Sequence, residues 1–297
     1  MGTLWQDIRY GFRMLRKSPG FAVLAMLTLA LGIGANLALF GILNEMLLRP
    51  KPVARPHELW AAVPADESGQ QIGALVYRPY YDAISREGRL FQDVIGYAGI
   101  RPKIRMDEGN ERIWAELVAG DYFSFLGVVP VLGRGFLPEE KTETGRSAVA
   151  VISHAFWQSY FGGMRDVLGK TVTLNDAPLE IVGVAPPGFA GLDCFGQPSL
   201  WIPANMETVL EKKSTSYEIV GRLTEPKLAR TVEEHLTPIA ADITKGLSES
   251  KFPDLSLKGI SPITQIRLEP IGRGLLGTSY IRPKIIRFLQ FLSLIHI

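Results

Sequence analysis

The stretch GGMRDVLGKT, Gly162–Thr171, contains the residue types of a phosphate-binding loop. That motif reads G-x-x-x-x-G-K-[ST], and its backbone N–H groups curl around the phosphates of a nucleotide. Gly169–Thr171 supplies the last three positions, but the first glycine should then stand at position 164, which is Met164. Because Gly163 stands one place too early, the spacing does not fit the motif.

The elements predicted around this stretch also come in the wrong order. A phosphate-binding loop follows a buried strand and opens a helix. Here HAFWQSYF (His154–Phe161) predicts a helix before the glycines. TVTL (Thr171–Leu174) and LEIVGV (Leu179–Val184) predict a β-hairpin after them, with its turn at Asn175-Asp176. We therefore expect a chain that does not hydrolyse ATP itself.

No other arrangement of residues predicts catalysis. No serine stands in G-x-S-x-G, and the single cysteine, Cys194, has no motif around it. The acidic residues are either scattered or paired where a solvated face is expected. The scattered ones are Asp121, Asp176, Glu180 and Asp193, and the pairs are Glu139-Glu140 and Glu233-Glu234.

The histidines do not form a metal site either. They lack H-x-x-x-H and H-E-x-x-H spacing, so we expect ordinary surface or core residues. They are His57, His154, His235 and His296. We accordingly predict no catalytic residue, no cofactor and no metal ligand, and we do not expect an enzyme.

Composition narrows the class of protein. The 297 residues allow about two ordinary domains. A net charge of +2 gives no reason to expect a nucleic-acid partner. One cysteine excludes a disulfide within the chain, and it leaves open both a cytosolic protein and an exported one without disulfides.

Hydrophobic residues are concentrated near the N-terminus. Phe21–Leu43 contains 23 residues and no charge. At 1.5 Å per residue a helix of this length reaches about 34 Å, enough for a hydrocarbon core of about 30 Å. The alternatives are a buried soluble helix and a cleaved signal peptide, but the apolar run continues beyond the 7–15 residues of a signal sequence. We predict a retained membrane anchor over residues 21–48.

The residues before this run predict a surface helix on the cytoplasmic side. In LWQDIRYGFRMLRK (4–17) the apolar side chains fall on one helical face and the basic ones elsewhere, which is typical of a helix lying on a membrane. Arg9, Arg13, Arg16 and Lys17 favour a cytoplasmic N-terminus, although basic residues also follow the span. Within the span, Ala30, Gly34 and Ala38 either pack against another membrane helix or reflect ordinary composition.

Residues 49–283 predict a large domain outside the membrane. A proline-rich segment, RPKPVARP, comes first. Strands and helices then alternate irregularly, which indicates an α+β fold. We expect a helix with a break over 78–97, an alternating strand over 114–118, a strand over 148–152, a helix capped by Ser153, a strand over 216–223 and a helix over 228–247.

Long segments of the chain resemble a known family. MLRKSPGFAVLAMLTLALGIGANLALFGILNEMLLRP closely resembles the first transmembrane segment of MacB/FtsX-type ABC transporter permeases, above all the acidobacterial-type permeases that lack a fused ATPase domain. AELVAGDYFSFLGVVPVLGRGFLPEE (115–140) resembles that family's periplasmic core domain, as does the segment 149–189. GRLTEPKLARTVEEHL resembles its later strand and helix.

The resemblance implies a function and a place in the cell. It implies a non-catalytic permease subunit in the bacterial inner membrane, with a cytoplasmic segment over 1–20 and a MacB-like periplasmic core domain over 49–283. Its partners would be an ABC ATPase subunit, a second permease in a homo- or heterodimer, membrane lipid and, in some members, a periplasmic adaptor protein. It would couple ATP hydrolysis by the partner to efflux or to mechanical work in the periplasm.

The chain also departs from the family pattern. Asn175-Asp176 stands where the family usually has Asn-Gly, and Glu225-Pro226-Lys227 replaces the usual Pro-Gly turn. RPKIIRFLQFLSLIHI should open a second membrane helix, but its apolar run, Phe288–Ile297, is too short to span a bilayer. We therefore expect residues 284–297 to be the start of a truncated helix.

Two alternative functions follow from the residues alone. One is a membrane-anchored periplasmic sensor or binding module that needs a single span. The other is a soluble secreted enzyme released by signal cleavage. Composition and periodicity by themselves support only a one-span membrane protein with an exported α+β domain.

Overall fold

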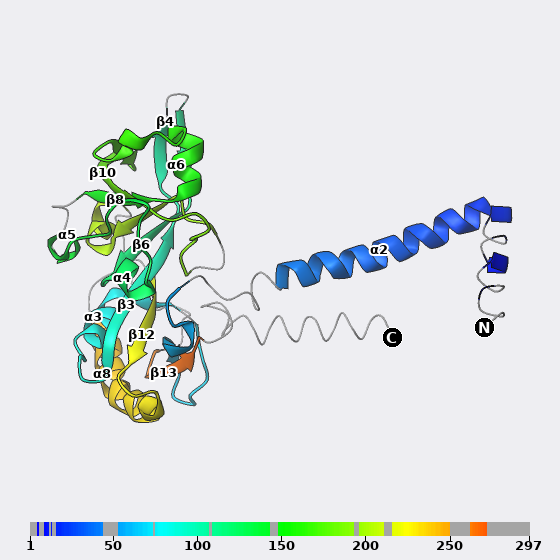
Figure 1. The fold of residues 1–297 in the computed structure, drawn as a ribbon. Coiled ribbons are helices and arrows are strands. Elements are labelled where there is room, and N and C mark those ends of the chain that lie inside the picture. The colour runs from blue at the N-terminus through cyan, green and yellow to red at the C-terminus, as the bar shows by residue number, and fades with distance from the viewer. Residues whose placement is uncertain are drawn as a thin grey trace. The chain divides into compact units, whose positions relative to one another are not determined.

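The computed structural model describes residues 5, 9–11, 13, 16–43, 53–73, 75–106, 109–142, 148–192, 196–210, 216–249 and 262–271. Positions 35, 38–40, 42, 43, 106, 142, 248 and 249 are described for the backbone alone. Asp193, Cys194, His296, the segment 284–297 and half of the expected helix over 4–17 lie outside the described residues. The chain divides into two compact units, Met1–Arg49 and Pro50–Ile297 (Figure 1).

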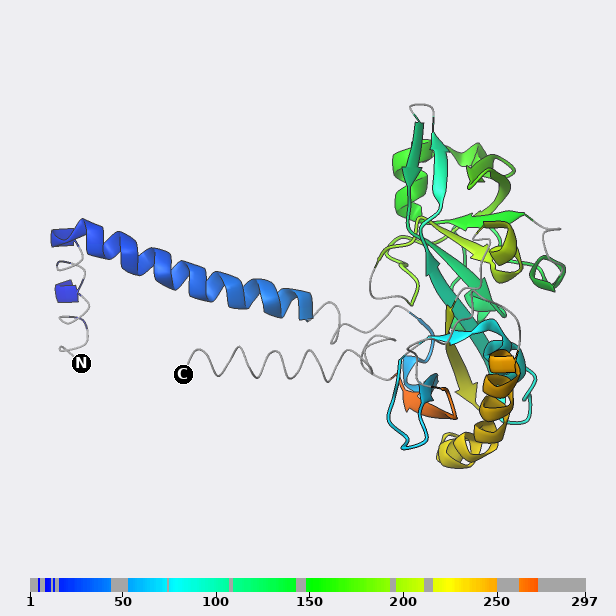
Figure 2. The ribbon, with the colours of Figure 1, turned by 180° about the vertical axis from the view of Figure 1, so that it is seen from behind.

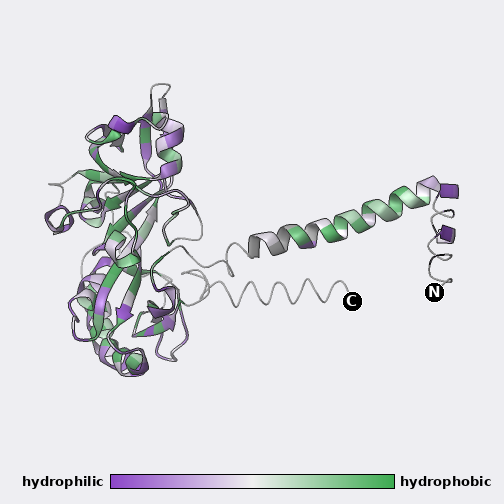
Figure 3. Cartoon of the chain, in the orientation of Figure 1, coloured by the Kyte–Doolittle hydropathy of each residue, from purple (hydrophilic) through white to green (hydrophobic). Residues whose placement is uncertain are grey.

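The first unit contains the helix α2, Pro19–Leu43, of 25 residues. Hydrophobic residues run along it (Figure 3), and large apolar side chains such as Phe21 and Leu31 are exposed. Its two polar side chains bond to the helix itself: Thr28 Oγ1 donates to Leu24 O, and Asn36 Nδ2 donates to Gly32 O. In the described part of the chain, no helix has both the length and the apolar character needed to cross a membrane.

The second unit is built on one large mixed sheet. Its described strands follow the spatial order β13-β1-β12-β3-β6-β11-β8-β10-β9-β4-β5, while β2 pairs with β12 and β7 with β10. The strands are β1 Leu59–Ala65, β2 Val76–Tyr77, β3 Phe91–Ile100, β4 Lys103–Met106, β5 Gly109–Arg112, β6 Ala115–Ala119, β7 Leu132–Gly133, β8 Val149–Ile152, β9 Thr171–Leu174, β10 Ala177–Val184, β11 Leu200–Pro203, β12 Ser216–Leu223 and β13 Gln265–Pro270.

Helices cover both faces of this sheet. One face packs against α3 (Arg78–Ser85), α6 (His154–Phe161) and α8 (Ala229–Glu249), and the other packs against α4 (Tyr122–Leu126). Figures 1 and 2 show α3 and α8 lying together along one end of the sheet. Strands in the middle of the sheet therefore bury side chains on both faces, as in β6, where Leu117 and Val118 belong to different cores. The remaining short helices are η2 Pro56–Glu58, α5 Pro138–Thr142, η3 Arg165–Val167, η4 Ala204–Met206, α7 Glu207–Leu210 and η5 Pro226–Leu228.

Many expected elements are confirmed. The mixed α/β character, the strand over 148–152, the strand over 216–223 and the long helix near 228–247 are all present. Ser153 caps α6 as expected, because its Oγ accepts a hydrogen bond from Phe156 N at 3.1 Å. The hairpin of β9 and β10 turns at Asn175 and Asp176, whose φ angles of 46° and 68° are those of a two-residue hairpin turn.

The expected helix over 78–97 is wrong in its second half. Helix α3 ends at Ser85, and Phe91–Ile100 forms strand β3 between β12 and β6. This strand is buried on both faces, with Val94 and Ala98 in one core and Ile95 and Tyr97 in the other. An apolar run that is buried on both sides lacks the strict alternation that distinguishes a strand from a helix in sequence.

The expectation that Glu140 lies on a solvated face is also wrong. Only 7% of this residue is exposed. Arg134 donates two hydrogen bonds to its carboxylate, at 2.7 and 2.8 Å, and Leu137 N donates a third at 2.8 Å. Burial alone raises the pKa of Glu140, but these hydrogen bonds outweigh burial, so its pKa lies below its ordinary value. The ion pair between Arg134 and Glu140 thus fixes the segment that follows β7.

Glu140→Gln should lower the free energy of unfolding by about 1–2 kcal/mol at neutral pH, because the bidentate charge-assisted bonds are lost. A carboxyl whose folded pKa is depressed stabilises the fold above its unfolded pKa and loses that contribution as pH falls through the folded pKa. The difference between wild type and variant should therefore shrink in acid. Urea unfolding at several pH values measures this. Glu139→Gln, at the exposed neighbour, is the control, and a pH-independent difference would contradict the prediction.

Candidate functional site

The stretch that resembles a phosphate-binding loop does not hold its amides open for a ligand. Gly169 N donates to Ile181 O at 2.9 Å, and Lys170 N donates to Val167 O at 3.2 Å. The Lys170 side chain lies against Met164 Sδ and Asp166. The predicted helix, turn and hairpin are thus confirmed. Among the described residues, no group of three or more His, Cys, Asp or Glu side chains could hold a metal ion.

The chain enters and leaves the described part of the second unit on neighbouring strands. Residues 53–58, called here the lead-in segment, open into β1, and β1 pairs with the last described strand, β13. The two strands are antiparallel, with Trp60 opposite Pro270. Ile271 N donates to Leu59 O at 2.9 Å, so the first residue of β1 is bonded to the residue that follows β13.

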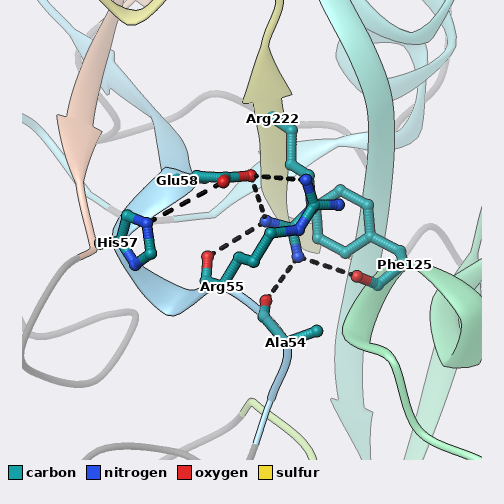
Figure 4. Close-up of polar contacts among 6 residues, drawn as sticks. All are labelled: Ala54, Arg55, His57, Glu58, Phe125 and Arg222. Carbon is teal, nitrogen blue, oxygen red and sulfur yellow. Dashed lines mark hydrogen bonds and ion pairs between the residues drawn. The ribbon is translucent and has the colours of Figure 1, made fainter.

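A buried arginine holds the lead-in segment. Arg222 lies on β12 directly opposite Leu59 of β1, and only 3% of it is exposed. Its Nη2 donates to Ala54 O at 2.6 Å and to Phe125 O at 3.0 Å, and its Nη1 donates to Arg55 O at 3.1 Å (Figure 4). Three backbone carbonyls from two separate segments therefore converge on one guanidinium.

A carboxylate completes this cluster. Glu58 Oε2 lies 3.2 Å from Arg222 Nη1 and 3.1 Å from Arg55 Nη1, so it bridges two arginines (Figure 4). Burial lowers the pKa of Arg222, and the charge of Arg55 lowers it further, while Glu58 raises it. An arginine still keeps its charge at any physiological pH. A buried charge of this kind requires the paired carboxylate and the carbonyl oxygens around it.

The C-terminal end of α4 forms the other side of the cluster. Ala54 N donates to Leu126 O at 2.7 Å, and the Arg222 guanidinium lies 4.9 Å from the centre of the Phe125 ring. Gly127 ends the helix in the left-handed region, at φ 68°. A Cβ at Gly127 would stand 2.5 Å from Ala54 Cβ, so glycine is needed both for the turn and for the close approach of the lead-in segment.

A second buried cluster lies at the other end of α4. Glu116 on β6 is fully buried, and its Oε2 accepts hydrogen bonds from Tyr122 Oη at 3.0 Å and from Trp201 Nε1 at 2.7 Å. Tyr122 Oη in turn accepts from Leu192 N at 3.3 Å. Burial, and then the charge of Glu116, raise the pKa of Tyr122 well above its ordinary value, so the phenol stays protonated as a donor.

Sequence reasoning missed the residues that organise both clusters. The alternating pattern predicts the strand over 114–118 but says nothing of Glu116, whose carboxylate lies in the interior because both faces of β6 are covered. Arg222 was missed for the same reason: it lies on β12 at a position that is also buried. The available signal is a charged residue between apolar neighbours in a strand, which indicates a buried charge that needs a partner but does not identify that partner. The partners Ala54 and Phe125 are distant in sequence and carry no signal of their own, because they bind through backbone carbonyls.

A family model described as the MacB-like periplasmic core domain matches residues 22–239. The macrolide export ATP-binding/permease protein MacB of Chlorobium phaeobacteroides is 23% identical over 211 residues, which cover 64% of this chain. The same match covers 31% of that relative, so this chain corresponds to about a third of its length.

Two solved structures have a similar fold. The extracellular domain of the noncanonic ABC-type transporter YknZ from Gram-positive bacteria matches with a TM-score of 0.51 and 14% identity, over 71% of this chain and 98% of that chain. The periplasmic region of MacB from Actinobacillus actinomycetemcomitans matches with a TM-score of 0.51 and 14% identity, over 79% of this chain and 94% of that one. At this identity the likeness shows the fold alone.

Arg222→Lys should lower the free energy of unfolding by about 2–4 kcal/mol, because lysine keeps the charge but cannot reach three carbonyls and a carboxylate at once. The amide of Ala54 should also exchange faster with solvent. Urea unfolding and hydrogen exchange measure the two effects. Arg55→Lys, at an arginine whose side chain is 59% exposed, should change stability by less than about 0.5 kcal/mol. Equal effects of the two substitutions would contradict the prediction.

Proposed function

The chain belongs to the MacB-like periplasmic core domain family, and on that premise we propose that it is a non-catalytic permease subunit of an ABC transporter. In this proposal a partner subunit hydrolyses ATP. The domain formed by residues 49–283 receives the resulting movement from the membrane and uses it for efflux or for mechanical work in the periplasm.

One observation carries this proposal. The lead-in segment opens into β1, which pairs with β13, and the lead-in segment is bonded to Arg222 and to α4. A domain whose incoming connection is held by buried hydrogen bonds follows that connection as a rigid body. A chain that only anchors a domain has no need for such a junction, because a flexible tether is sufficient.

We propose, from the sequence, that the chain has a membrane anchor. The support is the run of 23 uncharged residues over Phe21–Leu43, and not the structure, in which no described helix qualifies as a span. The anchor would cover residues 21–48, the segment 1–20 would lie in the cytoplasm, and the main domain would lie in the periplasm. The protein would then be located in the bacterial inner membrane.

The proposed partners follow from the same premise. An ABC ATPase subunit would bind on the cytoplasmic side, where residues 4–17 offer an amphipathic surface. A second permease would complete a homo- or heterodimer, and a periplasmic adaptor protein would contact the main domain. Membrane lipid would surround the proposed anchor.

Membrane topology is tested by cysteine labelling. In a Cys194→Ser background, Lys227→Cys, at a side chain that is 80% exposed, should react with a membrane-impermeant maleimide once the outer membrane is opened. Arg16→Cys should react only after the inner membrane is permeabilised. Labelling of both positions under the first condition would contradict the proposed orientation.

Coupling to ATP is tested on the complex isolated from native membranes. We expect an ABC ATPase to copurify with the chain, and ATP with vanadate to change hydrogen exchange in residues 53–59 and 265–271. Exchange in a complex whose ATPase carries an inactivated catalytic site is the control. If no ATPase copurifies and nucleotide has no effect, the membrane-anchored sensor or binding module becomes the better account.

A further inference from the structure

The helix α4 contacts both buried clusters although it has only five residues. Its C-terminal carbonyls, Phe125 O and Leu126 O, accept hydrogen bonds from Arg222 and from the lead-in segment. Its first residue, Tyr122, accepts a hydrogen bond from Leu192 N and donates one to Glu116. The two ends of one helical turn and a half thus bond to segments that are far apart in the sequence.

The middle of α4 is packed by aromatic rings. Phe123 is 4% exposed, and its ring centre lies 5.6 Å from that of Phe136, 6.2 Å from that of Phe189 and 5.9 Å from that of Trp201. Phe189 and Trp201 also pack on each other at 5.0 Å. Close-packed aromatic interiors rearrange by discrete steps and do not deform smoothly, so a shift of α4 must move these neighbours.

The far end of these contacts is a loop that is exposed at Pro187 and Gly188. Phe189 and Leu192 belong to the segment 185–192, APPGFAGL, which follows β10. Gly188, Phe189 and Ala190 line a cleft of about 230 Å³ together with the first turn of α6 and residues 197–199. A shift of Phe189 therefore changes the shape of an open surface feature.

We propose that α4 is a relay that passes displacement of the lead-in segment to the loop 185–192, with Tyr122 as the positioning residue. Arg222 and the Ala54 amide fix the lead-in segment to the C-terminal end of α4. Tyr122 and Phe123 fix the loop to the rest of the helix. The relay itself follows from contacts within the domain, whereas its use in transport rests on the proposed function.

A substitution at Gly127 can displace the lead-in segment from α4 directly. A methyl group there would stand 2.5 Å from Ala54 Cβ, so Gly127→Ala pushes the lead-in segment and α4 apart. Gly162→Ala is a matched control, because Gly162 also ends a helix in the left-handed region, at φ 61°, but a Cβ there meets nothing within 4 Å. Ala54→Gly in the Gly127→Ala background removes the clash and leaves the backbone strain.

The readout is hydrogen exchange in the full chain in lipid nanodiscs. Relative to Gly162→Ala, Gly127→Ala should speed exchange of the peptide 188–192 by about fivefold or more, and the added Ala54→Gly should reverse most of this change. Thermal unfolding of each variant shows that it is folded. If exchange of that peptide is the same in the Gly127→Ala and Gly162→Ala variants, α4 does not act as a relay.

Tyr122→Phe tests the positioning residue. It removes the hydroxyl between Leu192 and Glu116 but leaves Phe123 packed on Phe189, so in this background the effect of Gly127→Ala on exchange of the Leu192 amide should fall below about twofold. Tyr97→Phe is the matched control, since Tyr97 is also buried but donates its hydroxyl hydrogen bond to Glu218, at 2.6 Å. In the Tyr97→Phe background the fivefold effect should persist.

The outcomes separate the two proposals. Non-additive effects of Gly127→Ala and Tyr122→Phe support the relay, and additive effects overturn it. None of these measurements uses ATP or a partner. The relay can therefore be supported even if no ATPase copurifies with the chain. In that case the proposed function is wrong and the relay is not.

Discussion

The guanidinium of Arg222 is taken out of water with up to five N–H donors, and the backbone around it is arranged so that oxygen atoms face them. Carbonyls of Ala54, Arg55 and Phe125 and the carboxylate of Glu58 supply those oxygens. An unpaired buried charge costs several kcal/mol, so the lead-in segment and the end of α4 cannot leave this position cheaply. The path of the chain into β1 is thus a consequence of satisfying one side chain.

Arg222 and Glu116 are buried because the sheet is covered on both faces. Helices on one face and α4 on the other bury the middle of the central strands, so Arg222 and Glu116, which lie in that buried part, need internal partners. Arg222 uses backbone oxygens, and Glu116 uses the hydroxyl of Tyr122 and the indole of Trp201. The short helix α4 serves both, because its C-terminus offers free carbonyls and its first residue offers a phenol.

The parts of the fold that could be read from the sequence are those that depend on local chemistry. Ser153 before an apolar helix and Asn175-Asp176 between two alternating runs specify a cap and a hairpin without reference to the rest of the chain. The strand Phe91–Ile100 could not be recognised, because its burial on both faces depends on strands that are distant in sequence. Glu140 and Arg222 were missed for the same reason. A buried charged residue needs a partner, but which residue becomes that partner depends on the tertiary structure.

The antiparallel pair β1 and β13 responds differently to different forces. The beginning of β1 and the end of β13 lie at the same end of the pair, and the Ile271 N to Leu59 O bond is the last rung there. A force that pulls the two chain connections apart therefore peels the ladder one hydrogen bond at a time, starting at that rung. A force that moves the two connections in the same direction does not pull β1 and β13 apart, and it shifts the sheet as a whole. Because Arg222 holds the lead-in segment to β12 and α4, β1 stays with the sheet under such a force, and the strand that separates is β13, the end strand of the sheet.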